Sequence, residues 1–403
     1  MNAKTDIRAL SLEQISSRLT DLGEPRFRAR QVHDWLWQKG VHDFAQMSNL
    51  PLSLRQKLDE HFAVNNGHIA REQHSIDGTI KNAVALHDGN VVESVLIPTD
   101  TRITACVSSQ VGCSLDCSFC ATARLSRVRN LNADEIFDQV VTIREQARLH
   151  FGRPLTHIVF MGMGEPLLNY PQVMGAIDRI TAADGLAMAP WRITLSTAGI
   201  PKMIRKLADD RKRIRLAVSL HSAIPEKRTR LMSVNAACPL PELQSALQYW
   251  YRQTGSKVTF EYVVWAGVND TDDDIRALLA FTARIPSKVN LIQYNAIDKG
   301  PYQQAGVDAV EAYRIRLLNA GVAVSIRRSR GSDIDAACGQ LAGSLTGKDT
   351  GTTDLQTGSV TVVPGIAGKQ ATGISGGEVG ATGKIQNTSD RPNIKTTIKT
   401  KAL

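Results

Sequence analysis

No stretch of about 18 consecutive apolar residues occurs in the 403-residue sequence, which excludes a helix that spans a membrane. The first residues, Met-Asn-Ala-Lys-Thr-Asp, also lack the apolar core of a signal peptide. Cysteine is scarce, with six residues in the whole chain. Clustered thiols in a chain without an export signal favour the reducing cytoplasm, where disulfides are rare unless they are catalytic.

Four of the six cysteines fall within fifteen positions, from Cys106 to Cys120. Cys113, Cys117 and Cys120 have the spacing C-x-x-x-C-x-x-C, and thiolates are soft ligands that suit iron–sulfur clusters, zinc and cuprous copper. The chain has no second C-x-x-C pair and no H-x-x-x-H motif, which argues against a zinc finger. Three thiolates leave one iron of a 4Fe-4S cluster without a cysteine, as a catalytic metal site requires. The polar residues between the cysteines indicate a loop and argue against three ordinary core cysteines.

Between residues 102 and 330, short β-branched apolar segments alternate with helix-forming segments, which predicts an α/β fold with a parallel sheet. In such sheets the active groups gather at the C-terminal ends of the strands. The expected strands are Ile103–Val107, His157–Met161, Arg192–Thr197, Ile214–Leu220, Lys257–Val264, Lys288–Tyr294 and Val322–Arg327. The expected helices include Asp134–Leu149, Pro171–Ile180, Leu240–Arg252 and Asp272–Arg284.

The chain divides by composition into four regions. We expect a small N-terminal helical accessory domain at 1–67, a β-hairpin extension at 68–100, the α/β domain at 101–345 and a flexible low-complexity tail at 346–403. In the first region Ser11 resembles a helix cap, and the pattern of the second helix predicts an inner face with Phe27, Val32, Trp35 and Leu36. The net charge of +9 is compatible with binding to a nucleic-acid backbone.

Several ordered motifs resemble those of one known family. They are Cys-Val-Ser-Ser-Gln-Val-Gly-Cys at 106–113, Gly-Met-Gly-Glu-Pro-Leu-Leu-Asn at 162–169, Leu-Ser-Thr-Ala-Gly at 195–199, Ser-Leu-His at 219–221 and Asp-Ile-Asp-Ala-Ala-Cys-Gly-Gln-Leu at 333–341. Over about residues 5–345 the chain resembles the RlmN/Cfr family of radical S-adenosylmethionine (SAM) RNA adenine methyltransferases, and it is most like the RlmN branch. The resemblance implies that the α/β domain is a partial (β/α)6 radical SAM barrel that binds a 4Fe-4S cluster and SAM.

The resemblance also implies a role for individual residues. Gly164 and Glu165 match positions that contact the amino group of SAM. The implied cluster ligands are Cys113, Cys117 and Cys120, and the other implied SAM contacts are Ser196, Ser219, Leu220, His221 and Asn295.

Three further residues, Cys338, Cys106 and Glu93, match catalytic positions of the family. In the implied reaction, one SAM methylates the sulfur of Cys338, and a 5′-deoxyadenosyl radical from a second SAM removes a hydrogen from that methyl group. The methylene radical adds to an adenine carbon, and Cys106 releases the adduct by forming a disulfide with Cys338. Glu93 matches the proposed proton acceptor. An adenine ring carbon has no nucleophilic lone pair, so direct displacement on SAM is unfavourable and the cofactor must supply the difficult chemistry.

The same resemblance implies the partners. The substrates are adenosines in large-subunit ribosomal RNA and in the anticodon loop of transfer RNA, and the target base must be exposed or flipped to be reached. The resemblance further implies an electron donor such as flavodoxin and a monomeric protein without a membrane attachment.

Three other functions remain open at this stage. Cfr-type methylation of carbon 8 shares every motif quoted above. A radical SAM reaction on a protein or a small molecule would not need the pair Cys106 and Cys338. A non-catalytic iron–sulfur RNA-binding sensor would form no 5′-deoxyadenosine.

Overall fold

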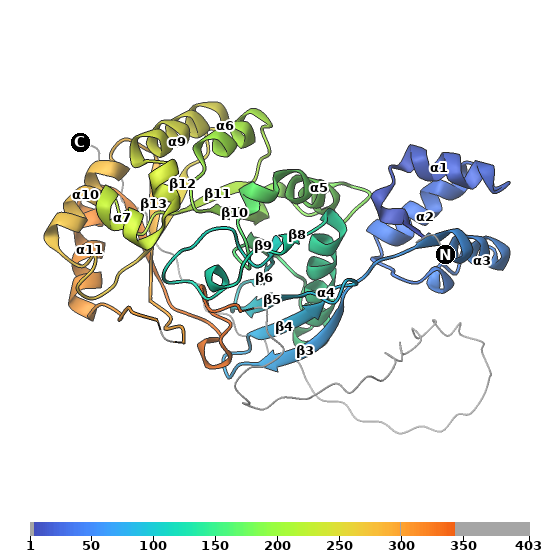
Figure 1. Ribbon diagram of the computed structural model, residues 1–403, viewed down its shortest axis with the longest axis horizontal. Coiled ribbons are helices and arrows are strands. Elements are labelled where there is room, and N and C mark those ends of the chain that lie inside the picture. The colour runs from blue at the N-terminus through green and yellow to red at the C-terminus, as the bar shows by residue number, and fades with distance from the viewer. Residues whose placement is uncertain (1–3, 299, 343–403) are drawn as a thin grey trace, which may run out of the picture. The chain divides into compact units, whose positions relative to one another are not determined.

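The computed structural model describes residues 4–298 and 300–342, so the expected tail at 346–403 lies outside the described residues. The first described elements form a small helical module (Figure 1). Its first helix starts as expected at Ser11, whose hydroxyl accepts a hydrogen bond from the Gln14 N–H while the Gln14 side chain accepts one from the Ser11 N–H. The module contains α1 (Leu12–Asp21), α2 (Phe27–Trp37) and α3 (Leu52–His61), with the short parallel strands β1 (Thr5–Asp6) and β2 (Phe62–Ala63).

The expected inner face of α2 is partly wrong. Phe27 is 57% exposed and Trp35 is only half-buried, whereas Trp37 is buried. The ring of Trp37 packs edge-on against Phe137, with 5.1 Å between the ring centroids. Phe137 belongs to α4 (Ala133–Phe151), which follows far later in the chain. The buried side of α2 therefore depends on a distant partner that the periodicity within α2 does not reveal.

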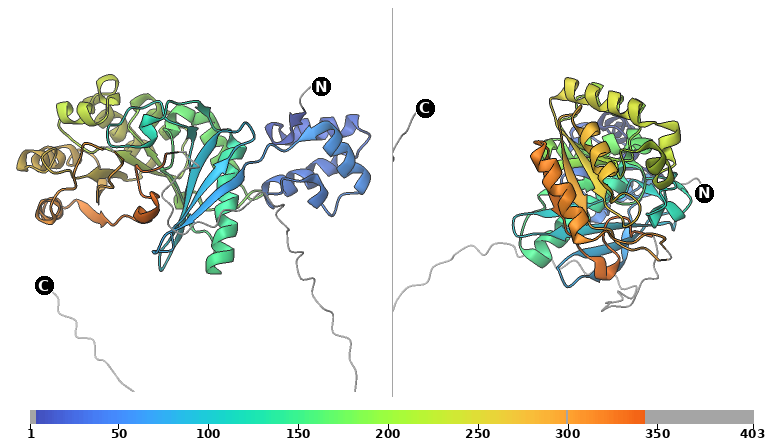
Figure 2. Two further views of the ribbon diagram at one scale, coloured as in Figure 1. Left: turned by 60° about the horizontal axis from the view of Figure 1, so that its bottom comes forward. Right: turned by 90° about the vertical axis from the view of Figure 1, so that its left-hand side faces the viewer.

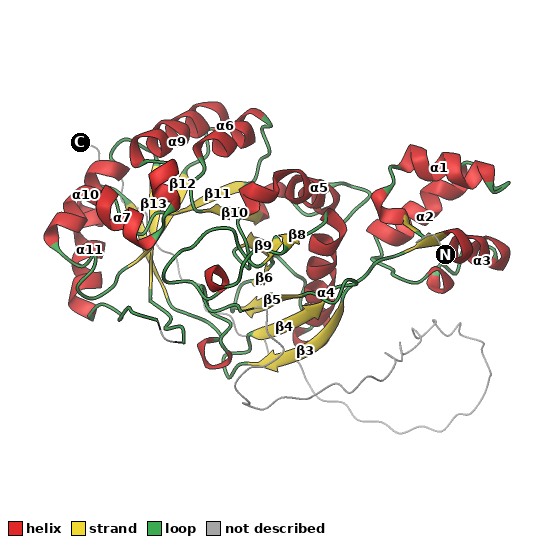
Figure 3. Cartoon of the chain, in the orientation of Figure 1, coloured by secondary structure: helices red, strands yellow, loops and turns green. Residues whose placement is uncertain are grey.

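One ten-stranded sheet forms the α/β domain (Figures 1 and 3). Its order is β14-β13-β12-β11-β10-β9-β6-β5-β4-β3, and the strands from β14 to β6 pair in parallel. Each connection between successive parallel strands contains at least one helix, which confirms the expected partial (β/α)6 barrel. The strands are β3 (His68–His74), β4 (Ile80–Ala85), β5 (Val91–Pro98), β6 (Ile103–Cys106), β9 (His157–Phe160), β10 (Ile193–Thr197), β11 (Arg215–Ser219), β12 (Val258–Val263), β13 (Ser287–Ile292) and β14 (Ala323–Arg327). The connecting helices are α4, α5 (Tyr170–Thr181), α6 (Pro201–Asp209), α7 (Pro225–Leu231), α8 (Val234–Ala237), α9 (Leu240–Thr254), α10 (Asp272–Thr282) and α11 (Val307–Asn319).

The hairpin expected around Gly89 joins β4 to β5 and is confirmed, with Ala85 opposite Val91. β3 adds a third antiparallel strand that pairs with β4. β5 also pairs with β6, where Val95 lies opposite Cys106. The antiparallel strands thus continue the barrel sheet next to the strand that leads into the cysteine loop.

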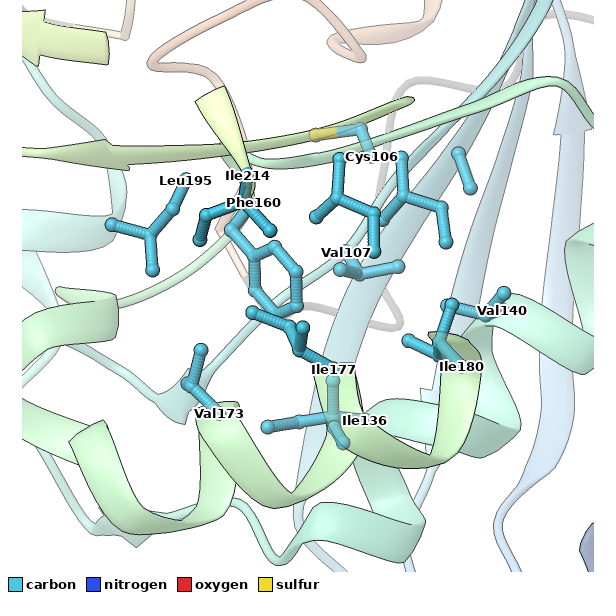
Figure 4. Packing of buried hydrophobic residues seen from close by; sticks show 14 of the residues in the cluster. Cys106, Val107, Ile136, Val140, Phe160, Val173, Ile177, Ile180, Leu195 and Ile214 are labelled. Atoms are coloured by element: carbon cyan, nitrogen blue, oxygen red, sulfur yellow. The ribbon is translucent and has the colours of Figure 1, made fainter. Parts of the chain in front are cut away.

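Helices cover the outer face of the sheet (Figures 1 and 2). Phe160 of β9 is buried and packs with Val173 and Ile177 of α5, as Figure 4 shows. Burial of one such side chain contributes about 1.5–3 kcal/mol to stability. Successive side chains of a strand point to opposite faces of the sheet, so a residue of a neighbouring strand can face away from α5. Figure 4 accordingly shows the sulfur of Cys106 on the side of the sheet away from α5.

Candidate active site

The cysteine loop lies between two short strands that close its base, β7 (Gln110–Val111) and β8 (Arg129–Asn130), which pair in antiparallel orientation. Cys113, Cys117 and Cys120 all line one cavity, which encloses about 1110 Å³ including its open mouth. The loop therefore brings the three expected cluster ligands to the edge of a single ligand-sized space.

The environment of these thiols tests whether a metal cluster fits. Burial and repulsion from Cys120 raise the pKa of Cys113 to about 11, and the same kinds of cause raise the pKa of Cys117. Such thiols stay protonated at neutral pH unless a bound metal stabilises the thiolates. Cys113, Cys117 and Cys120 line one cavity, and three thiolates that each bind a different iron are a donor set for a 4Fe-4S cluster, so the three thiols fit such a cluster.

The strand ends bring most of the expected SAM contacts to the same cavity. Its lining includes Gly164, Glu165, Ser196, Ser219, His221 and Asn295. Leu220 does not line it: its side chain is fully buried, and its N–H donates to the carbonyl of Glu261. Leu220 directly follows β11, and its side chain packs into the main apolar core of the protein.

The carboxylate of Glu165 is buried and held in place by backbone amides. It accepts hydrogen bonds from the N–H of Leu167 at 3.0 Å and of Ala198 at 2.7 Å. Burial raises the pKa of Glu165, because the charged form loses its hydration. A cationic ligand group in the cavity would offset this loss, so the site suits a bound ammonium.

His221 contributes a neutral imidazole to the lining. Its Nδ1 accepts a hydrogen bond from the N–H of Val263 at 3.2 Å. Burial and the nearby Arg228 cation lower the pKa of His221 to about 3. The imidazole therefore stays uncharged across the neutral range and can donate only through Nε2.

The two glycines of the Gly-Met-Gly-Glu motif are required by close packing against the strand before the cysteine loop. A Cβ on Gly162 would lie 2.7 Å from the carbonyl oxygen of Val107. Gly164 has φ +94, and a Cβ there would lie 2.9 Å from the backbone nitrogen of Gln110. The absence of side chains at Gly162 and Gly164 thus lets the residues before the cysteine loop pack closely against the segment that follows β9.

The substitution Gly164→Ala is expected to reduce the free energy of unfolding by about 1–3 kcal/mol through its backbone conformation alone. The overlap with Gln110 should add to this loss and shift the cysteine loop, so that SAM affinity falls as well. Chemical denaturation and equilibrium binding of SAM measure the two effects. Gly89→Ala is the matched control, because Gly89 has φ +81 and open space around its Cβ position. Equal losses in both variants would contradict the close-packing role.

The two catalytic cysteines of the prediction, Cys106 and Cys338, line one shared cavity. Cys338 lines the large cavity together with the cluster cysteines, and it also lines a second cavity of about 540 Å³ including its open mouth. Cys106 lines this second cavity. Burial, and then repulsion from Cys338, raise the pKa of Cys106 to about 12. All six cysteines are free, so the structure contains no disulfide between these two sulfurs.

The segment that carries Cys338 is tied to the cysteine loop and to the end of β13. The Ala121 N–H donates to the carbonyl of Gly339 at 2.7 Å, and the Thr122 hydroxyl donates to that of Leu341 at 2.6 Å. Asn295 donates to the carbonyl of Cys338 at 3.3 Å. These bonds fix a residue distant in sequence beside the cluster ligands.

Glu93 lies next to this segment but lines neither cavity. It is buried, accepts a hydrogen bond from the Ala342 N–H at 2.7 Å and pairs with Lys81 at 3.4 Å. In this conformation the structure does not bring its carboxylate into the space that Cys338 and Cys106 share.

Known proteins resemble the chain along most of its length. Residues 5–64 match the family described as Ribosomal RNA large subunit methyltransferase N-terminal domain, and residues 107–281 match the Radical SAM superfamily. A protein of Christiangramia forsetii named "Probable dual-specificity RNA methyltransferase RlmN" is 57% identical over 339 residues, which cover 84% of this chain and 96% of that protein. The chain belongs to the RlmN family. Its "Dual-specificity RNA methyltransferase RlmN" relative from Geotalea uraniireducens is 41% identical over 342 residues, which cover 85% of this chain and 98% of the relative.

A solved structure also matches this RlmN-family chain. A radical SAM methyltransferase from Sphaerobacter thermophilus aligns with a TM-score of 0.80 and 38% identity, covering 84% of this chain and all of that one. None of the helices in the described ranges has the length and apolar content needed to cross a membrane.

Two features of the RlmN-family site were not expected from the sequence. Glu261 of β12 and Arg327 of β14 both line the large cavity and form an ion pair at 3.2 Å. The sequence signal for Glu261 was a charged residue within the otherwise apolar strand β12. The ring of Trp265, absent from every motif, packs against Phe119 at 5.1 Å between centroids and against His221 at 5.6 Å. Phe119, the aromatic residue before the third cluster cysteine, thereby contacts the rings of both Trp265 and His221.

Proposed function

We propose that this RlmN-family protein methylates carbon 2 of an adenosine in large-subunit ribosomal RNA and in the anticodon loop of transfer RNA. The position of Cys338 carries the proposal, because it lines both the cavity of the cluster cysteines and the cavity of Cys106. A methyl carrier needs access to SAM on one side and to a resolving thiol on the other. The names of the curated relatives, dual-specificity RNA methyltransferases, support RNA as the substrate.

The large cavity is the proposed site of both cofactors. Cys113, Cys117 and Cys120 would hold the 4Fe-4S cluster, and Gly164 and Glu165 would bind the SAM amino group. When bound, the cluster supplies one electron, received from a donor such as flavodoxin, that cleaves SAM to a 5′-deoxyadenosyl radical. The remaining proposed SAM contacts are Ser196, Ser219, Leu220 through its backbone, His221 and Asn295.

Cys338 carries the transferred carbon in this scheme. Its sulfur first takes a methyl group from one SAM and releases its proton. The S-methyl group then loses one hydrogen atom to the radical, and its carbon bonds to carbon 2 of the adenine. The adduct radical would return one electron to the cluster, and loss of the carbon-2 proton, for which Glu93 is the proposed acceptor, would restore the aromatic ring.

Cys106 ends the reaction by breaking the link between protein and RNA. Its thiolate attacks the sulfur of Cys338, the carbon–sulfur bond breaks, and the released carbon takes a proton to become the methyl group. A disulfide between Cys106 and Cys338 forms, and an external thiol must reduce it by two electrons before the next turnover. Burial raises the pKa of Cys106 to about 12, so the free thiol is protonated at neutral pH and must lose its proton before it attacks.

Positive charge near the second cavity supports a phosphate-rich substrate. Arg327, Arg328 and Arg330 contribute to its lining, and guanidinium groups pair readily with phosphate. A flipped adenosine would place its backbone phosphates at such a rim.

The test of the proposal is anaerobic turnover with SAM, a reductant and RNA, followed by mass analysis of the digested nucleosides. Comparison with authentic isomers should show 2-methyladenosine in both ribosomal and transfer RNA. The 8-methyl isomer would instead assign Cfr-type chemistry. RNA binding without any 5′-deoxyadenosine would assign a non-catalytic sensor.

A further inference from the structure

Arg228 of α7 is a buried cation beneath the cysteine loop, and its side chain has 0% exposure. Its guanidinium donates to the carbonyls of Ala198 at 2.6 Å and Leu220 at 3.3 Å, and to the amide oxygen of Asn235 at 2.9 Å. Among the described residues, no Asp or Glu forms an ion pair with it. Because no carboxylate in the described ranges neutralises this charge and water does not reach it, its field is screened less than the field of a surface cation.

The guanidinium group of Arg228 stays charged at neutral pH. Burial lowers the pKa of Arg228 to about 10, and attraction to the thiolate forms of Cys117 and Cys238 opposes that change. A group with such a pKa is protonated at pH 7.

Hydrogen bonds fix α7 against the cysteine loop. The backbone N–H of Ser118 donates to the carbonyl of Leu231 at 3.0 Å, and its hydroxyl donates to the same carbonyl at 3.2 Å. Cys117 packs with Leu231 and Met232 in one apolar cluster. The separation between the cation and the cysteine loop is therefore set by packing and does not depend on a flexible side chain.

We propose that Arg228 raises the reduction potential of the iron–sulfur cluster, in addition to tying together the ends of β10 and β11. Reduction adds one negative charge to the cluster, and a fixed cation in a region of low dielectric stabilises the reduced form more than the oxidised form. This inference rests on the cluster of the proposed function. Arg228 acts through the cluster and touches no substrate, so it is a positioning residue.

The experiment is a redox titration of the anoxically reconstituted full-length protein, with the reduced cluster measured by electron paramagnetic resonance. In Arg228→Gln, the ratio of reduced to oxidised cluster at the wild-type midpoint is expected to fall about tenfold, equivalent to about 59 mV for one electron. Arg228→Lys keeps the charge and should stay close to the wild type. Asn235→Asp leaves Arg228 in place but neutralises it with a carboxylate, so it should lower the ratio in the same direction.

Arg230→Gln is the matched control, because Arg230 lies on the same helix and is exposed to water. It removes the same formal charge, but solvent screening should leave the midpoint unchanged. If Arg228→Gln fails to fold, Asn235→Asp decides the question. Unchanged midpoints in the folded variants overturn this inference and leave the proposed function intact. Absence of iron from the reconstituted wild type overturns the proposed function itself.

Discussion

The substitution Cys338→Ala is expected to abolish methylation of RNA, with product below detection. No other described thiol lines both cavities, so none can take over the carbon at Cys338. The cluster ligands and the contacts proposed for SAM are untouched by the change. Reductive cleavage of SAM to 5′-deoxyadenosine should therefore continue at a measurable rate while methyl transfer stops.

Nucleoside mass analysis and quantification of 5′-deoxyadenosine separate these two outcomes in one reaction mixture. Cys238→Ala is the control, because Cys238 lines neither cavity and should retain full activity. Persistent methylation by Cys338→Ala would assign the protein to a radical SAM reaction without a cysteine carrier.

The substitution Cys106→Ala is expected to arrest the reaction one step later, with RNA covalently attached to the protein. In the proposed mechanism, the carbon–sulfur bond to the RNA breaks only when a second thiol attacks the sulfur of Cys338. Alanine cannot make this attack, so the adduct should accumulate toward one RNA per chain. Methylated RNA should fall by a factor of about 100 or more, in the range seen when one essential group of a covalent mechanism is lost.

Denaturing gel electrophoresis with labelled RNA detects this adduct as a band that migrates more slowly than the protein. The double variant Cys106→Ala with Cys338→Ala should show no such band, which identifies the attachment point. A single Cys106→Ala variant that releases methylated RNA at the normal rate would remove Cys106 from the mechanism.

Local pattern predicts the barrel strands well. The strand expected at His157–Met161 is observed at His157–Phe160, and the one expected at Val322–Arg327 is observed at Ala323–Arg327. Such strands carry β-branched apolar residues bounded by polar turns, and both signals are local in sequence. Because these strands are parallel, their C-terminal ends share one edge, so the motifs there could be expected to meet.

The side-chain contacts that the sequence does not reveal involve residues that are distant in the chain. Leu220 lies within a site motif, yet its side chain packs into the apolar core and does not line the cavity. Glu93 is bound to Ala342, almost 250 residues later, and no pattern in β5 indicates that contact. Arg228 looks like any basic residue of a polar helix, since only the packing of α7 under the cysteine loop buries its charge.

The central claim is that the transferred carbon passes through the sulfur of Cys338. Turnover with SAM that carries a trideuterated methyl group, in ordinary water, tests it most directly. The methyl group of the product should contain two deuterium atoms, and one deuterium should appear in 5′-deoxyadenosine. A product that retains all three deuterium atoms would mean direct transfer of an intact methyl group and would contradict the account.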